Sequence, residues 1–187
     1  YDIGVRLVGS EMCIRDSNRY STTGETSLRN IQPFFADLHM GGLSVAHNGN
    51  LTNALQLREA LVKDGAIFRT TSDTETIVQL IAKSKREKIV DKLIDALFQI
   101  KGGYSLVIMT VDKLVGMRDP LGVRPLCIGR INGGWVLASE SCALDHIGAE
   151  YVREVEPGEA VVIDDDGLGV RQIRVRYRSR ADKDALA

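Results

Sequence analysis

The sequence of 187 residues is long enough for one domain with a substantial core, and its 44% hydrophobic and 26% charged residues are typical of a soluble globular protein. Its formal net charge of −1 argues against a nucleic-acid interface or a membrane-surface patch, and no apolar run reaches the roughly 20 residues that span a bilayer. The three cysteines form no CxxC pair, which disfavours zinc and disulfide frameworks and favours a reducing, cytoplasmic compartment.

The first 17 residues differ from the rest of the chain. They show neither a strand nor a helix period, and Val8–Ser17 resembles translated adaptor read-through. We therefore expect residues 1–17 to be foreign to the native protein, the alternative being an ordinary N-terminal strand and turn. The fold prediction assigns residues 18–170 to one domain and leaves 171–187 as a tail of uncertain structure.

The first predicted elements are a strand and a helix joined by a turn. A short apolar run predicts a buried strand over Gly41–Ala46. Asn48-Gly49 then predicts a sharp turn, and the apolar spacing that follows predicts a helix over Leu51–Lys63 with Asn50 as its N-cap.

Two more helices are predicted before the strands begin. Ser72 and Glu75 have the spacing of a capping box at the start of the second helix. The third helix, about Lys88–Ile100, has one apolar stripe and stops at Gly102-Gly103.

After Gly103 the pattern changes to short strands separated by tight turns, with one short helix capped by Ser141 and ending at Ile147. Neighbouring strands joined by tight turns predict an antiparallel sheet, which the earlier helices should cover on one face, giving an α+β fold. The predicted strands are Tyr104–Thr110, Leu114–Arg118, Leu126–Ile131, Trp135–Ser139, Tyr151–Val155 and Glu159–Ile163.

Asn48 and Gly49 are candidates for an oxyanion hole. A side-chain amide and an approachable glycine N–H would lie side by side at the end of a strand, and two converging donors suit the negative oxygen of a tetrahedral intermediate. The alternative is an ordinary hairpin turn, because both residue types tolerate positive φ.

Arg19 and Asp73 are candidates for recognising a free amino acid. A guanidinium suits a carboxylate held by two hydrogen bonds, and a carboxylate suits an ammonium group. The alternatives are a surface ion pair for Arg19 and helix-dipole stabilisation for Asp73. Sequence spacing alone does not show that the two side chains meet.

Several motifs occurring in order resemble the glutaminase domain of the amidophosphoribosyltransferases. The resemblance covers about residues 19–163 and implies a partial type 2 glutamine amidotransferase domain over residues 18–170. It implies the N-terminal-nucleophile hydrolase fold, a four-layer αββα sandwich, here incomplete. The motifs are Arg19–Gly24, His47–Leu51, Thr70–Glu75, Arg118–Leu126, Ala138–Asp145 and Val155–Glu159.

The same resemblance implies roles for individual residues. Arg19 and Thr22 would bind the α-carboxylate of glutamine, Asp73 its α-ammonium group, and Asn48 and Gly49 the oxyanion. The nucleophile of the family is an N-terminal cysteine whose α-amino group acts as base. Ammonia would pass to a second domain and react with phosphoribosyl pyrophosphate, giving 5-phosphoribosylamine for purine biosynthesis.

The sequence departs from this pattern in its cysteines. It begins at Tyr1 rather than at cysteine, and Cys13 is interior and lacks a free α-amino group. Cys127 and Cys142 are expected to be small packing residues, and His47 to be structural rather than a general base.

We therefore expect a fragment that lacks both the nucleophile and the transferase domain and is inactive alone. It would hold no cofactor: Mg²⁺ would belong to the missing domain, an iron–sulfur cluster is undetermined, and the full-length protein would be a homo-oligomer. Two other hypotheses stay open: a different class II amidotransferase, of the sugar-phosphate transaminase or asparagine synthetase type, or a non-catalytic glutamine-binding module.

The run Val161–Gly167 superficially resembles the apolar-then-acidic motif that binds phosphoribosyl pyrophosphate. No phosphate loop rich in glycine and threonine follows it. A strand that ends in an Asp-Gly turn is the better interpretation.

Overall fold

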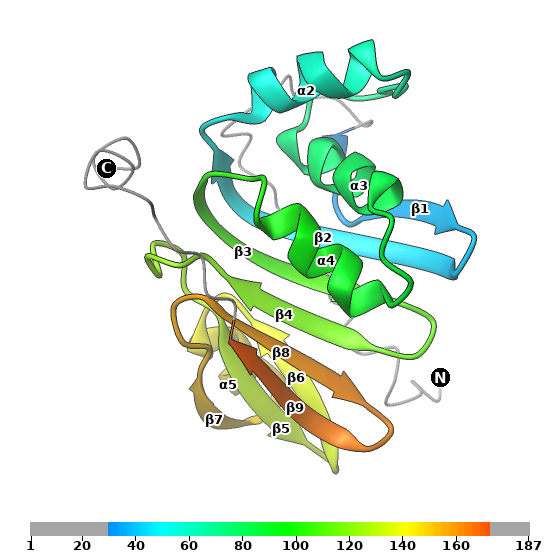
Figure 1. The fold of residues 1–187 in the computed structure, drawn as a ribbon. Helices are drawn as coiled ribbons and strands as arrows, with labels where there is room; N and C mark the ends of the chain where they lie inside the picture. The colour runs from blue at the N-terminus through cyan, green and yellow to red at the C-terminus, as the bar shows by residue number, and fades with distance from the viewer. Residues whose placement is uncertain (1–29, 173–187) are drawn as a thin grey trace.

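The structure, a computed structural model, describes residues 30–172 and has a mixed helix-and-sheet fold (Figure 1). The elements in chain order are β1 (Phe34–Leu38), β2 (Gly41–Leu51), α2 (Ala54–Lys63), α3 (Asp73–Lys83), α4 (Ile89–Leu97), β3 (Gly102–Met109), β4 (Leu114–Arg118), β5 (Cys127–Ile131), β6 (Gly134–Ala138), α5 (Ser141–Ile147), β7 (Glu150–Glu154), β8 (Glu159–Asp164) and β9 (Gly167–Gln172).

The larger sheet has six strands in the order β1-β2-β3-β4-β8-β9, and every neighbouring pair is antiparallel, as the sequence predicted. Helices α2, α3 and α4 lie on one side of this sheet (Figure 1). Alternate residues of β2 point toward the helices, because successive side chains of a strand face opposite ways. Leu43 and Val45 of β2 pack there with Ile77 and Ile81 of α3.

A second sheet has the order β6-β5-β7 and lies in sequence between β4 and β8. One apolar cluster packs it against the larger sheet and includes Ile128 of β5 and Val161 of β8. Another packs its far side against α5 through Val136 and Leu144. The turn pattern had predicted a single sheet, and this is wrong, because tight turns specify pairing between neighbours but not the crossover from β4 to β8.

The buried guanidinium of Arg118 joins the segments that connect the two sheets. Its Nε donates to the carbonyl of Arg124 at 2.8 Å, and its Nη2 donates to the carbonyl of Gly122 at 3.1 Å. Its Nη1 reaches the carbonyl of Val155 at 2.7 Å and the carboxylate of Glu154 at 3.1 Å. One side chain therefore fixes the loop that leaves β4 and the segment that returns to β8.

The predicted turn and helix start near Asn48 are wrong. Strand β2 runs through Asn48-Gly49 to Leu51, and α2 begins only at Ala54, with Asn53 as its N-cap. The strand continues because β3 pairs with it as far as Leu51 opposite Gly102. Backbone hydrogen bonds along this register outweigh the local turn preference of Asn-Gly.

The predicted cap of α3 is half right. The Ser72 side chain does cap the helix, accepting a hydrogen bond from the backbone N–H of Thr74 at 3.3 Å. The carboxylate of Glu75 instead accepts the backbone N–H groups of Arg69 and Thr70, both at 2.8 Å, so no reciprocal capping box forms.

Other predicted boundaries shift by a few residues. The third helix is shorter than expected at Ile89–Leu97, and Glu140 rather than Ser141 is the N-cap of α5. Strands β1 and β9 were not predicted. The Asp-Gly turn is confirmed, because Gly167, at φ +112°, opens β9 in a hairpin with β8.

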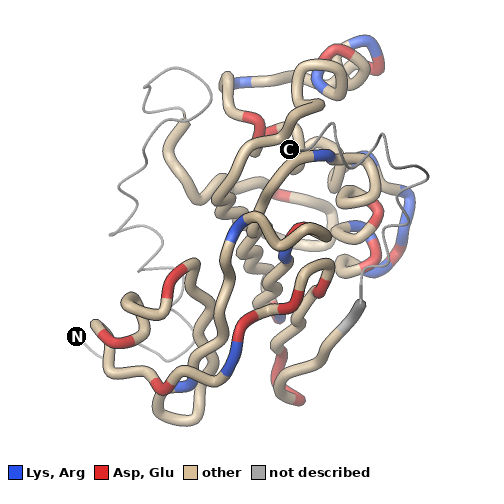
Figure 2. Tube along the Cα trace, turned by 90° about the vertical axis from the view of Figure 1, so that its left-hand side faces the viewer, with Lys and Arg blue, Asp and Glu red and all other residues tan. Residues whose placement is uncertain are grey.

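Charged residues of both signs are mixed along the described part of the chain (Figure 2). Among residues 30–172, no helix is long and apolar enough to cross a membrane.

Candidate functional site

Asn48 and Gly49 lie near the end of β2, inside the sheet. They are opposite Ser105 and Tyr104 of β3. Gly49 has φ +144°, and a Cβ atom there would lie 2.1 Å from the carbonyl oxygen of Gly103. The glycine is thus required by the close approach of β3 rather than by a turn.

The Asn48 side chain is exposed, and its Nδ2 donates to Oγ of Ser139 at 3.2 Å. Ser139 follows β6 of the second sheet. The neighbouring His47 is buried on the other face of β2, where it meets α3. The two residues therefore point to opposite faces of one strand.

Asp73, the first residue of α3, contacts the residues on both sides of the Asn48–Asn50 segment, the backbone of Leu51 and the side chain of His47. Its Oδ2 accepts the N–H of Leu51 at 3.0 Å, and its Oδ1 lies 3.6 Å from Nδ1 of His47. Its side chain is only 2% exposed, so it does more than interact with the helix dipole at a surface. The fold brings this residue to the predicted oxyanion segment from one helix away, which the sequence alone could not establish.

A short hydrogen-bonded network surrounds the His47 side chain. The backbone N–H of His47 donates to Oε1 of Gln32 at 2.6 Å, and Nε2 of Gln32 donates to Oγ1 of Thr74 at 3.2 Å. The same hydroxyl lies 3.2 Å from Nδ1 of His47. Sequence reasoning missed Gln32, because the segment before β1 has no period or motif that would single it out.

Arg19 and Thr22, the predicted carboxylate-binding residues, lie outside the described residues, as does Cys13. Cys127 is buried, as predicted. Burial raises the pKa of its thiol, and the negative charge of Glu154 raises it further, which disfavours the nucleophilic thiolate. Cys142 is exposed in the first turn of α5, so its predicted packing role is wrong.

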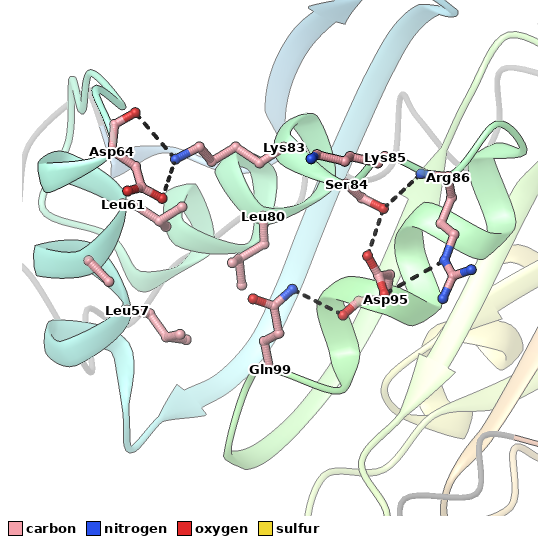
Figure 3. A pocket seen from close by; sticks show the side chains of 11 residues that line it. Leu57, Leu61, Asp64, Leu80, Lys83, Ser84, Lys85, Arg86, Asp95 and Gln99 are labelled. Carbon is pink, nitrogen blue, oxygen red and sulfur yellow. Dashed lines mark hydrogen bonds and ion pairs between the residues drawn. The ribbon is translucent and has the colours of Figure 1, made fainter.

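A pocket lies among α2, α3 and α4, and none of the predicted site residues lines it (Figure 3). Leu57, Leu61 and Leu80 form its apolar part. Four of its charged residues form ion pairs, Lys83 with Asp64 at 3.0 Å and Arg86 with Asp95 at 3.8 Å, and Lys85 also lines it.

A family model described as a glutamine amidotransferase domain matches residues 18–146. The chain belongs to this family. The matched region includes Asn48, Gly49 and Asp73, so the glutamine amidotransferase domain contains the whole of the segment described above.

Known relatives of this glutamine amidotransferase domain are amidophosphoribosyltransferases. That of Rhizobium etli is 47% identical over 168 residues, which are 90% of this chain and 34% of the relative. The chloroplastic amidophosphoribosyltransferase 1 of Arabidopsis thaliana is 53% identical over 151 residues, which are 80% of this chain and 27% of the relative. The chain thus spans between about a quarter and a third of the length of these relatives.

A solved structure supports the same family. The glutamine phosphoribosylpyrophosphate amidotransferase from B. subtilis, complexed with ADP and GMP, matches with a TM-score of 0.79 and 42% identity, covering 84% of this chain and 34% of that one. A glutamine aminotransferase class-II domain protein from Silicibacter pomeroyi, 14% identical with a TM-score of 0.55, shares the fold.

Proposed function

We propose that the chain is the glutaminase part of an amidophosphoribosyltransferase, which releases ammonia from glutamine for transfer to phosphoribosyl pyrophosphate, giving 5-phosphoribosylamine in purine biosynthesis. One observation carries the proposal: the Asp73 carboxylate lies against both ends of the Asn48–Asn50 segment. An anion able to pair with an ammonium group is thus held against the strand that carries both candidate oxyanion donors, in a chain of the glutamine amidotransferase family.

In this mechanism Asp73 binds the α-ammonium group of glutamine, and Arg19 with Thr22 binds the α-carboxylate. Because Asp73 is buried, its attraction for the ammonium group is screened less than at a surface. The Asn48 amide exchanges its bond to Ser139 for the oxyanion, and the Gly49 N–H provides the second donor.

The nucleophile would be the N-terminal cysteine of the mature protein. Its thiol gives its proton to the α-amino group, and its sulfur bonds to the side-chain amide carbon. The tetrahedral intermediate collapses to a thioester as ammonia leaves with that proton, and water then releases glutamate. Of the cysteines that the structure describes, Cys127 has a disfavoured thiolate, and Cys142 is an interior residue of α5 and so has no free α-amino group to act as base.

The finer architecture we propose is the four-layer αββα sandwich of N-terminal-nucleophile hydrolases. It is supported by three apolar clusters in succession: helices α2–α4 on the larger sheet, that sheet on the smaller one, and the smaller sheet on α5.

Phosphoribosyl pyrophosphate and its Mg²⁺ would bind in the second domain of the full-length, cytoplasmic homo-oligomer. Residues 30–172 contain no group of three or more His, Cys, Asp or Glu side chains arranged to hold a metal ion. Val161–Gly167 forms a β-hairpin, which supports placing the phosphate site elsewhere.

Calorimetry with L-glutamine and with 4-carbamoylbutanoate, the same molecule without its α-ammonium group, tests the binding step. We expect the chain to prefer L-glutamine, and Asp73→Asn to lose at least about tenfold in affinity for L-glutamine alone, because a charge-assisted hydrogen bond is lost. Equal affinity of the wild-type chain for the two ligands would contradict the proposed role of Asp73.

The catalytic step is tested in the full-length protein. Asn48→Ala should lower kcat for glutamine hydrolysis by about 10²–10³ with little change in KM, because the oxyanion forms only during the reaction. Ser139→Ala is the matched control, since it removes the present partner of the Asn48 amide and leaves the amide in place. An equal loss of kcat in both variants would contradict the oxyanion role.

A further inference from the structure

His47 has a buried ring nitrogen with no hydrogen-bond partner among the residues that the structure describes. The side chains of His47 and Asp73 are 1% and 2% exposed, and Nε2 of His47 has no partner, whereas Nδ1 faces Thr74 and Asp73. A buried polar atom without a partner is unfavourable, because it loses its hydrogen bonds to water on folding and gains none in return. Such an atom in a well-packed site calls for an explanation.

The hydrogen bonds around His47 indicate which ring nitrogen carries the proton. The Gln32 amide is oriented by the backbone N–H of His47, which donates to its Oε1, so Nε2 of Gln32 is the donor to Thr74. A bare Nδ1 could accept a hydrogen bond from the Thr74 hydroxyl at 3.2 Å, but its lone pair would also face the Asp73 carboxylate at 3.6 Å, and a buried Nε2–H would have no acceptor among the described residues. Protonation of Nδ1 removes both conflicts and leaves only a bare acceptor at Nε2.

In this tautomer the Leu51 N–H donates a hydrogen bond to one oxygen of the Asp73 carboxylate, and the His47 Nδ1–H makes a longer electrostatic contact with the other. The Leu51 N–H binds Oδ2 of Asp73 at 3.0 Å, and Nδ1 of His47 lies 3.6 Å from Oδ1. The terminal torsion of an aspartate side chain is otherwise broad. The Leu51 hydrogen bond and the longer electrostatic contact with the His47 Nδ1–H, which also faces Oγ1 of Thr74 at 3.2 Å, therefore act on the two ends of the carboxylate and restrict its plane relative to strand β2.

We propose that His47, as its neutral Nδ1–H tautomer, is a positioning residue that orients Asp73 to receive the α-ammonium group of glutamine. The inference rests on the proposed function. It assigns His47 no contact with the reacting atoms. His47 belongs to the same strand as the oxyanion donors, so its contact with Asp73 sets the distance between the ammonium site and those donors.

Two substitutions at position 47 separate positioning from packing. In His47→Asn the amide N–H can replace Nδ1–H, whereas in His47→Gln the amide lies where Nε2 was. We expect His47→Gln to lose about tenfold in affinity for L-glutamine but not for 4-carbamoylbutanoate, and His47→Asn to keep the wild-type preference. Equal losses for both ligands would indicate a purely structural residue and overturn the inference.

The tautomer is measured directly by ¹⁵N NMR of the imidazole in the wild-type chain, which stays informative if a variant fails to fold. We expect a protonated Nδ1 and a bare Nε2, and the reverse assignment overturns the inference. A wild-type chain that does not prefer L-glutamine overturns both the proposed function and this inference. If the wild type prefers L-glutamine and a folded His47→Gln variant keeps that preference, only the inference fails.

Discussion

Gly49 is a position of β2 where the backbone of β3 leaves no room for a side chain. A Cβ atom would lie 2.1 Å from the Gly103 carbonyl oxygen and 2.8 Å from Cα of Tyr104. Across the strand pair, Gly102 has the reciprocal constraint, with a Cβ 2.2 Å from the carbonyl oxygen of Asn50. Both contacts are with backbone, which cannot move aside as a flexible side chain can.

Gly49→Ala should therefore lower the free energy of unfolding by at least about 2 kcal/mol more than Gly167→Ala. The two glycines share a positive φ, +144° and +112°, but no atom lies within 4 Å of a Cβ at Gly167. The difference between the variants thus isolates the clash from the backbone preference. Urea denaturation of both variants measures it, and equal losses would show that β3 shifts to accept the methyl group.

For individual residues, the sequence identified candidates for the site but not the contacts that those residues make. Asn48, Gly49 and Asp73 were singled out, yet the contact of Asp73 with Leu51 depends on a strand end and a helix start meeting in space. Gln32 could not be found from the sequence, because its importance comes only from its contacts with His47 and Thr74. The roles of Arg19 and Thr22 stay predictions.

At the scale of elements, the sequence predicted the strands with tight turns and the helices with a clear apolar stripe. It failed where the structure of a segment depends on which strand pairs with it. Asn48-Gly49 has a strong turn preference, but β3 extends β2 through it. Strand β1 is an edge strand whose described residues alternate between half-buried and exposed, so its pattern lacks the fully buried positions of a central strand.

Strand β8 begins at a buried glutamate that pairs with a partly exposed arginine, and this pair makes stability depend on pH. The Glu159 side chain is 2% exposed and binds both Nη atoms of the Arg153 guanidinium at 2.8 Å. Burial alone would raise the pKa of Glu159, but the hydrogen bonds from Arg153 and the Glu156 N–H and the charge of Arg153 outweigh it and lower the pKa below its ordinary value of 4.5. As the pH falls, the Glu159 carboxylate therefore takes up a proton at a higher pH in the unfolded chain than in the folded one.

Because the pKa is lower in the folded state, the stabilisation is complete above about pH 4.5 and is lost as the pH falls from there through the folded pKa. We expect the difference in unfolding free energy between the wild type and Glu159→Gln to be constant near neutrality and to shrink below that pH. Chemical denaturation across pH 3–7, a range of about four units, measures it. Arg153→Gln should remove most of this pH dependence, and a slope unchanged in that variant would contradict the assignment.

At the scale of the whole molecule, Arg118 links the two sheets through three backbone carbonyls and one carboxylate. Lysine keeps the charge but cannot direct donors to all of these groups at once, because it lacks the planar fork of a guanidinium. Arg118→Lys should lower the free energy of unfolding by about 2–3 kcal/mol.

Arg130→Lys is the matched control for Arg118→Lys. Arg130 lies exposed on β5, with its guanidinium 5.1 Å from the centre of the Trp135 ring, and its replacement should change stability by less than about 1 kcal/mol. Thermal or urea unfolding of both variants checks the contrast. Equal effects would mean that the two sheets do not depend on Arg118 for their connection.

The smaller sheet and α5 lie in sequence between β4 and β8, which are neighbours in the larger sheet. During synthesis, β4 therefore emerges from the ribosome well before the strand that will cover its edge. Until β8 arrives, this edge offers free backbone groups beside apolar side chains, the features that promote pairing between nascent chains. Premature termination before Glu159 should consequently yield an aggregating polypeptide rather than a smaller soluble one.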